Sequence, residues 1–394
     1  MKIDRTIIDN IVKSVFEAWI PHVYLIGGEP SLLGVKKLNE YIKLLSQRSS
    51  VTIVTNGQVY LEDISDKLAC IGIPIHGIGE THDSLAGKSG SFETAIKSIK
   101  RYVKRGIDVR CIPVLTKTNF DQMYDVIELA KNLGMESVFV DRYEDGGIGS
   151  IRSLELKPSL EEFRVALGQM IEGRNNFGIP VGWGTAIPFC LDERLISENM
   201  FADCGAGITF CAVNPKGEVR LCNQSERVYG NVLDEPINEI WHKPELSEFR
   251  DLGWVEKPCL NCSVLSDCMC GCKVDANHSE AFSIDYAVRE NGCFCEPESL
   301  TNNQENLNIP PDLRRFKLNK YTRINTKYKE KYLVTQYQTI ILDEIALSMM
   351  HQILSGVTDE EAMISLNAEF VDKYEVRKFV SVLDQVNAID IDKE

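Results

Sequence analysis

Short apolar segments alternate with amphipathic segments along the first half of the chain. The apolar segments do not alternate strictly with polar residues, which is typical of strands covered on both faces. We predict six strands, at residues 22–27, 51–55, 70–75, 108–114, 136–141 and 179–183. Because helical segments separate them, the pattern predicts an α/β fold with a parallel sheet and right-handed crossovers. In such sheets and barrels, ligands bind at the carboxyl ends of the strands.

The amphipathic segments predict helices with recognisable ends. One helix spans about residues 92–102 and carries its apolar residues on one face. Another spans about residues 120–133, and Asn119 is its predicted N-cap. The sequence from Ser159 to Glu162 predicts a capping box at the start of a third helix.

The later part of the chain differs in composition and indicates further domains. Residues 204–295 are rich in Cys, Gly and Asn with weak periodicity, so we expect their fold to depend on metal. A polar stretch that ends in two prolines is typical of a linker. Beyond it, a strand-like stretch at 321–342 and three helical segments predict a small winged-helix (α+β) domain. The predicted domains are residues 1–190, 191–300 and 313–394, with the linker at 301–312.

Composition and charge argue against several classes of protein, namely membrane proteins and generic binders of nucleic acid or anionic lipid. Of 394 residues, 44% are hydrophobic and 26% are charged, which is typical of a soluble globular protein. The formal net charge of −15 argues against generic binding to nucleic acid or anionic lipid, since both need a basic surface. The chain shows neither a membrane-length apolar run nor a signal peptide, so we expect a cytoplasmic protein without a membrane partner.

Cysteine is the most informative residue. The chain has 13 cysteines, and ten of them lie between Cys204 and Cys295. A disulfide framework fits a cytoplasmic protein poorly, so the crowding points to metal. Four thiolates hold a [4Fe–4S] cluster or a structural zinc ion, and eight could therefore hold two sites. Spacing alone leaves both metals open.

The spacing of these cysteines resembles the SPASM domain of radical S-adenosylmethionine (radical SAM) enzymes. The resemblance rests on Cys204, Gly217 and Cys222, followed by a Cys-x2-Cys-x5-Cys-x3-Cys run and a last cysteine. It implies two auxiliary [4Fe–4S] clusters. The first would be held by Cys204, Cys211, Cys222 and Cys272, and the second by Cys259, Cys262 and Cys268 with Cys295 or, nearly as well, Cys293. The remaining cysteines, Cys70, Cys111, Cys190 and Cys270, receive no role from the pattern.

The first half carries motifs that resemble those of radical SAM barrels. Gly27-Gly28-Glu29-Pro30 follows the first strand and resembles the GGEP motif, which contacts the amino end of the methionine moiety. Thr55-Asn56-Gly57 resembles the TNG turn, and residues 82–92 resemble a recurring HD..L.G..GSF stretch. The resemblance implies S-adenosylmethionine contacts from Gly27, Gly28, Glu29, Pro30, Thr55 and Asn56.

One motif of that family is missing. The catalytic cluster is held there by C-x3-C-x2-C after the first barrel strand, and no such spacing occurs in this chain. The predicted helix at 3–18 follows Met1 directly, so we expect a partial (β/α) barrel that lacks its first strand. A late start codon, a truncated gene or a natural cluster-less relative would explain this, and we favour a truncated record of an active enzyme. S-adenosylmethionine and a third cluster are then expected only in the full-length enzyme, and the chain as given should not generate the radical.

Residues 313–390 resemble the peptide-recognition element (RRE) of peptide-modifying enzymes. Such elements bind a leader peptide as an extra strand, and the edge strand is expected within residues 331–342. The second helix of this unit is expected to begin with a capping box from Thr358 to Glu361. The stretch 314–331 holds eight Lys or Arg, which fits an acidic leader peptide, a solvated basic face or, less well, nucleic acid.

Together the resemblances imply a radical SAM/SPASM maturase. Its substrate would be a ribosomally made precursor peptide, and hydrogen abstraction would lead to a thioether or carbon–carbon crosslink. An electron donor protein is a further expected partner. The alternative is a non-catalytic iron–sulfur or zinc protein that binds the leader peptide and acts with a catalytic chain. Glu80, Asp83 and Asp141 lie near strand ends, and we interpret each as a solvated or capping carboxylate.

Overall fold

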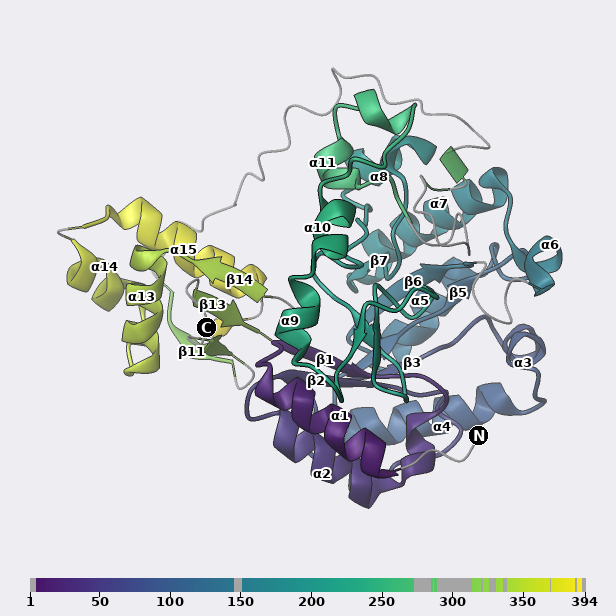
Figure 1. The fold of residues 1–394 in the computed structure, drawn as a ribbon, viewed down its shortest axis with the longest axis horizontal. Coiled ribbons are helices and arrows are strands. Elements are labelled where there is room, and N and C mark those ends of the chain that lie inside the picture. Colours follow the sequence, from purple (N-terminus) through teal and green to yellow (C-terminus); the bar gives the residue numbers. More distant parts are fainter. Residues whose placement is uncertain are drawn as a thin grey trace.

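The computed structural model describes most of the chain as three units (Figure 1). The described residues are 5–144, 151–272, 285, 287–288, 314–319, 322–325, 331–335, 339–368, 370–386 and 388–391. The first two units lie against each other, and the third projects to one side (Figure 1). None of the helices in the described segments has the length and apolar character that crossing a membrane requires.

The first unit is a seven-stranded sheet in which all strand pairs are parallel. The strands run in the order β1-β2-β3-β4-β6, while β5 and β7 also pair with β6. Their bounds are β1 (His22–Leu25), β2 (Ser50–Val54), β3 (Cys70–Ile73), β4 (Val109–Cys111), β5 (Val114–Leu115), β6 (Ser137–Arg142) and β7 (Val181–Trp183). All residues of β3 and all but the last of β2 are buried, as expected for strands covered on both faces. The prediction of a parallel α/β sheet is confirmed.

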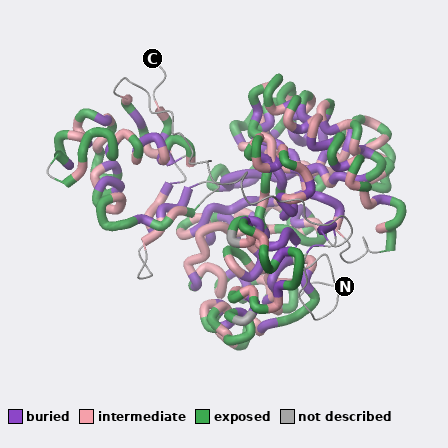
Figure 2. Tube along the Cα trace, turned by 90° about the horizontal axis from the view of Figure 1, so that it is seen from above, coloured by how far each residue is buried: buried purple, intermediate pink, exposed green. Residues whose placement is uncertain are grey.

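Helices and short turns connect these strands. They are α1 (Arg5–Glu17), η1 (Pro30–Leu33), α2 (Val35–Leu45), α3 (Glu80–Ala86), α4 (Ser91–Lys104), α5 (Met123–Asn132), α6 (Ser153–Leu156), α7 (Leu160–Phe177), η3 (Phe189–Leu191) and α8 (Arg194–Ser197). The capping box at the start of α7 is confirmed, because the Ser159 amide donates to Glu162 and the Glu162 amide donates to Ser159. Tube colouring by burial shows the sheet as the buried centre of this unit (Figure 2).

Two predictions for this unit were wrong in detail. The single strand expected at 108–114 is two strands, β4 and β5, because Pro113 has no N–H to donate and interrupts the pairing with β6. Asn119 does not cap α5, whose N-cap is Gln122. The Asn119 side chain instead accepts from the Thr116 amide at 2.6 Å and donates to the Val114 carbonyl at 2.8 Å, which ties the turn after β5 together.

The second unit holds little regular structure. A three-stranded antiparallel sheet consists of β8 (Ala212–Val213), β9 (Glu218–Arg220) and β10 (Gly230–Asn231). It is followed by α9 (Ile237–Trp241), α10 (Pro244–Arg250), η4 (Cys259–Asn261) and α11 (Leu265–Cys268). Its apolar cluster includes Ile11 and Ala18 from the N-terminal helix segment, so the first unit forms part of its core.

The third unit is a small α+β structure with its own core. The strands β12 (Arg323–Asn325), β13 (Lys331–Val334) and β14 (Thr339–Leu342) form one antiparallel sheet, and β11 (Phe316–Leu318) pairs with β15 (Ile389–Ile391). The helices are α13 (Glu344–Leu354), α14 (Glu360–Asn367) and α15 (Lys373–Gln385). Asp359, rather than Thr358, is the N-cap of α14, because its side chain accepts from the Ala362 amide.

The structure narrows the range of the expected edge strand and places two of the basic residues in contacts. Strand β13 is paired on both sides, so only β14 of the predicted range 331–342 lies at an edge of its described sheet. Arg314 is not a solvated cation, because it pairs with the fully buried Glu360 at 2.6 Å. Arg323 donates to the Ser46 carbonyl at 2.9 Å and so joins this unit to the first.

Candidate iron–sulfur and cofactor site

The loops after β1 and β2 meet at the Glu29 carboxylate. Gly27 and Gly28 turn the chain away from β1 with φ values of +84° and +53°, which L side chains rarely adopt. Glu29 then accepts from the Thr55 hydroxyl at 2.6 Å, the Asn56 amide at 2.9 Å and the Ser31 amide at 3.0 Å. Partial burial acts to raise the pKa of Glu29, but these hydrogen bonds outweigh it and lower the pKa. An ionised carboxylate therefore fixes the predicted cofactor loops to each other.

The motif at residues 82–92 has a structural role. The Asp83 carboxylate accepts from the Gly90 amide at 2.6 Å, the Ser91 hydroxyl at 2.9 Å and the Phe92 amide at 2.8 Å. These bonds satisfy the first amides of α4 and lower the pKa of Asp83, led by the Phe92 amide. The prediction that Asp83 is a capping carboxylate is confirmed.

Two histidines lie at the start of this motif, the half-buried His76 after β3 and the buried His82 within the motif. The His76 amide donates to Nδ1 of His82 at 3.1 Å, and the Val114 amide donates to Nδ1 of His76 at 3.1 Å. Burial lowers the pKa of His76 to about 4, with a smaller contribution from His82. Both rings accept backbone hydrogen bonds through Nδ1, so they fix the turn at this end of the sheet as neutral side chains.

Asp141, at the end of β6, is the strand-end acid that sequence reasoning misjudged. We interpreted it as solvated or capping, but it is half-buried and its carboxyl lies against Gly184. Burial, followed by the nearby Glu144 carboxylate, raises the pKa of Asp141 to about 7. A carboxyl group of this kind can accept or donate a proton near neutral pH. The signal available in the sequence was a single acid at the end of an apolar strand.

The first predicted set of cysteines comes together in the second unit. Cys204, Cys222 and Cys272 are buried in one apolar cluster, and the half-buried Cys211 packs against it. Burial raises the pKa of Cys222 to about 11 and the pKa of Cys272 well above its usual range. The neighbouring Cys204 makes a smaller contribution to both rises.

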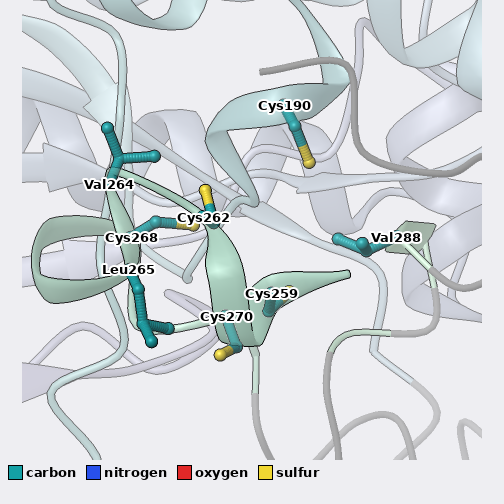
Figure 3. A pocket seen from close by; sticks show the side chains of 8 residues that line it. All are labelled: Cys190, Cys259, Cys262, Val264, Leu265, Cys268, Cys270 and Val288. Atoms are coloured by element: carbon teal, nitrogen blue, oxygen red, sulfur yellow. The ribbon is translucent and has the colours of Figure 1, made fainter. Parts of the chain in front are cut away.

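The second predicted set lines a small cavity (Figure 3). Cys259, Cys262 and Cys268 line it together with two cysteines that the pattern left without a role, Cys190 and Cys270. Its other lining residues are Val264, Leu265 and Val288. Burial raises the pKa of Cys268 to about 12, although the Phe189 and Gly271 amides hydrogen-bond to it and oppose the rise. The predicted ligands Cys293 and Cys295 lie outside the described residues.

A buried ion pair fixes the first set to the sheet. Arg142, at the end of β6, contacts Asp285 at 2.7 and 3.1 Å. Asp285 is fully buried and also accepts from the Cys272 amide at 2.8 Å and the Ala287 amide at 2.9 Å. Position 285 was not singled out in the sequence, because nothing in its local pattern shows that it meets Arg142.

The donor atoms at both places fit an iron–sulfur cluster or a zinc ion. Thiolates are soft ligands that favour these metals, and the second cavity offers only sulfur and apolar groups. Among the described residues, no group of three or more His, Cys, Asp or Glu side chains is placed so that it could hold a metal ion. A bound metal would displace the protons of its thiol ligands.

Comparisons with known proteins also indicate an iron–sulfur protein. Residues 4–139 match the radical SAM superfamily, and residues 204–263 match the SPASM iron–sulfur cluster-binding domain. The AdoMet-dependent heme synthase of Methanosarcina barkeri is 26% identical over 299 residues, which are 70% of this chain and 83% of that protein. The mycofactocin maturase MftC of Mycolicibacterium smegmatis is 26% identical over 283 residues, 67% of this chain and 68% of the maturase.

A solved structure shares the fold. The crystal structure of Streptococcus suis SuiB bound to precursor peptide SuiA aligns with a TM-score of 0.57 at 16% identity. The alignment covers 74% of this chain and 69% of SuiB. At this identity the likeness extends to the fold alone, which is that of the parallel sheet and its helices.

Proposed function

Because the chain carries a radical SAM domain and a SPASM domain, we propose that it modifies a ribosomally made precursor peptide by hydrogen abstraction. The product would be a thioether or carbon–carbon crosslink. The observation that carries the proposal is the gathering of the cysteines into two places within and beside the SPASM match. The similarity to a mycofactocin maturase supports a peptide substrate.

We assign the residues as follows. Cys204, Cys211, Cys222 and Cys272 hold one [4Fe–4S] cluster, and the cavity thiols hold another. The loops joined by Glu29 hold the amino end of S-adenosylmethionine. Bound clusters and S-adenosylmethionine supply the one-electron chemistry, whereas the protein positions the reactants and excludes water. No C-x3-C-x2-C spacing occurs in the 394 residues, so we propose activity for this chain together with a segment or partner that provides those thiolates. Dependence on thiolate ligands favours a reducing compartment, hence a cytoplasmic location.

We assign peptide binding to the third unit as a winged-helix recognition element. Strand β14 lies at an edge of its described sheet, and the Ile341 side chain on it is 66% exposed. An extended leader peptide would pair with this edge through its backbone and cover Ile341. Changing Ile341→Asp should weaken peptide binding without unfolding the unit, because the side chain is already in solvent. Leu154→Asp is the matched control, since Leu154 is 96% exposed and lies in the first unit.

Co-expression with the peptides encoded beside the gene tests the proposal. Formation of either crosslink removes two hydrogen atoms from the peptide, which mass spectrometry detects as a loss of about 2 Da. The chain should be expressed with any in-frame upstream C-x3-C-x2-C segment found in the DNA. Peptide binding with no mass change and no cleavage of S-adenosylmethionine would favour the non-catalytic alternative. Turnover of a tetrapyrrole instead of a peptide would favour a role like that of the heme synthase relative.

A further inference from the structure

The two faces of β6 are covered to different degrees. Val138 and Val140 are buried in the apolar core that the sheet forms with its helices. Phe139 and Asp141 alternate with them along the strand and are half-buried. Because successive strand residues point to opposite faces of a sheet, Phe139 and Asp141 share the face that is turned away from this core.

The strands beside β6 leave room on this face at its carboxyl end. A Cβ on Gly182 would lie 3.3 Å from the Phe139 ring, and a Cβ on Gly184 would collide with the Asp141 carboxylate. From β4, the Arg110 guanidinium covers the Phe139 ring at 4.5 Å from its centroid. Arg110 therefore fills the middle of the face, and Asp141 stands beyond it at the strand end, where parallel sheets bind their ligands.

Asp141 differs from two other acids at this end of the sheet in its hydrogen bonds. Glu29 and Asp83 each accept three hydrogen bonds from the protein. Within the described segments, no hydrogen bond joins the Asp141 carboxylate to another residue. Burial, and then the nearby Glu144 carboxylate, raise the pKa of Asp141 to about 7. The oxygens of Asp141 therefore remain for a ligand, and their basicity suits them to receive a proton.

The backbone around Asp141 is tied to the loop that carries Cys272. The next residue, Arg142, contacts Asp285 at 2.7 Å, and Asp285 accepts from the Cys272 amide at 2.8 Å. The Arg142 amide donates to the Thr185 hydroxyl at 2.8 Å, which fixes the end of β6 to the chain after β7. Asp141 is thus held at a defined place between the open face of the sheet and the first set of cysteines.

We propose that Asp141 takes up the proton that is released when the crosslink in the precursor peptide closes. The proposal rests on the proposed function, in that it takes this open face as the place where the peptide reacts. For a thioether, the carbon radical left by hydrogen abstraction bonds to a cysteine sulfur of the peptide, the S–H bond breaks, and the Asp141 carboxylate accepts the proton. One electron leaves in the same step, to an oxidised [4Fe–4S] cluster at the first set of cysteines. For a carbon–carbon crosslink, the proton comes instead from the carbon that is attacked.

Product analysis of two matched variants tests this role. The full chain would be assayed with the segment or partner that provides the C-x3-C-x2-C thiolates, with S-adenosylmethionine and with the precursor peptide. Asp141→Asn keeps the size of the side chain but removes the carboxylate. The control is Glu136→Gln, because Glu136 precedes the same strand at its amino end and its pKa is also raised, by burial and then by Asp108. We expect Asp141→Asn to form 5′-deoxyadenosine at close to the wild-type rate, and to yield about 10²-fold less crosslinked peptide per deoxyadenosine. Glu136→Gln should change neither quantity.

The outcomes separate this proposal from the proposed function. An unchanged yield of crosslinked peptide per deoxyadenosine in Asp141→Asn would overturn the proposal. Equal loss of deoxyadenosine and of crosslinked peptide would also overturn it, since Asp141 would then serve cofactor binding or folding. A wild-type chain that forms deoxyadenosine and leaves the peptide unchanged would instead refute the proposed function.

Carboxyl labelling of the wild-type chain gives a readout that needs neither turnover nor a folded variant. A water-soluble carbodiimide with glycine ethyl ester, followed by peptide mapping, should modify Asp141 in the free chain. Saturation with precursor peptide and S-adenosylmethionine should protect Asp141, whereas Glu136 should be modified equally in both samples. Labelling of Asp141 that the bound peptide does not reduce, or no labelling of Asp141 in the free chain, would contradict the proposal.

Discussion

Removal of Arg142 should be among the most destabilising single changes in this protein. The guanidinium is 6% exposed and the Asp285 carboxylate is fully buried, so Arg142→Ala leaves a charge in the interior with only two amide donors. Breaking a buried ion pair from one side costs about 3–5 kcal/mol. That corresponds to a fall of roughly 10²- to 10⁴-fold in the ratio of folded to unfolded protein.

The assay is urea denaturation followed by circular dichroism, with wild type and variants at the same metal content, because bound metal adds its own stabilisation. Arg152→Ala is the matched control, since Arg152 pairs with Glu155 at the same 2.7 Å but both side chains are exposed. The control should leave the midpoint close to that of the wild type. Asp285→Ala should destabilise the protein at least as much as Arg142→Ala, because it also removes the acceptor for the Cys272 and Ala287 amides. Equal midpoints for Arg142→Ala and Arg152→Ala would refute the reasoning.

Three further predictions concern single side chains. The pKa of Asp141 is raised to about 7, so its ionisation costs stability as the pH rises from about 4 to about 7. Asp141→Asn should therefore gain on the order of 2–4 kcal/mol over the wild type between these limits, and parallel pH profiles of unfolding would contradict this. Glu29→Ala should cost about 1 kcal/mol and weaken S-adenosylmethionine binding. Because the pKa of Glu29 is lowered from 4.5, the stability difference should be present in full above pH 4.5 and be lost as the pH falls through the lowered pKa, as thermal melts can show. Cys204→Ala and Cys259→Ala should each lose about four irons, and the double variant about eight, whereas identical loss in all three would mean a single shared site.

The parallel sheet was predictable because its information is local. Apolar segments of strand length, separated by amphipathic helices, are sufficient to indicate βα units. The errors arose where a single residue overrode the pattern of its neighbours. Asn119 is a good N-cap residue, yet its amide also reaches the Val114 carbonyl, and that turn delays the start of α5. Pro113 breaks a strand that its apolar neighbours would otherwise continue.

The candidate site likewise includes residues that the sequence could predict and residues that it could not. Spacing predicted Cys259, Cys262 and Cys268 as ligands, because thiols separated by two and five intervening residues can converge without help from other elements. It could not predict that Cys190 lines the same cavity, because Cys190 precedes the first of them by almost seventy residues and reaches the cavity through the packing of η3. Nor could it predict the surroundings of Asp141, since its carboxyl lies against Gly184, which follows a neighbouring strand.

The cysteine-rich unit is joined to the sheet at three separate places. Ile11 and Ala18 contribute to the apolar cluster around the first cysteines, Arg142 pairs with Asp285 beside Cys272, and Cys190 lines the second cavity. Each contact joins a part of the first unit to the immediate neighbourhood of a thiol. A metal that orders the thiols therefore also orders the sheet, because the free energy of binding acts on every group that the bound state fixes.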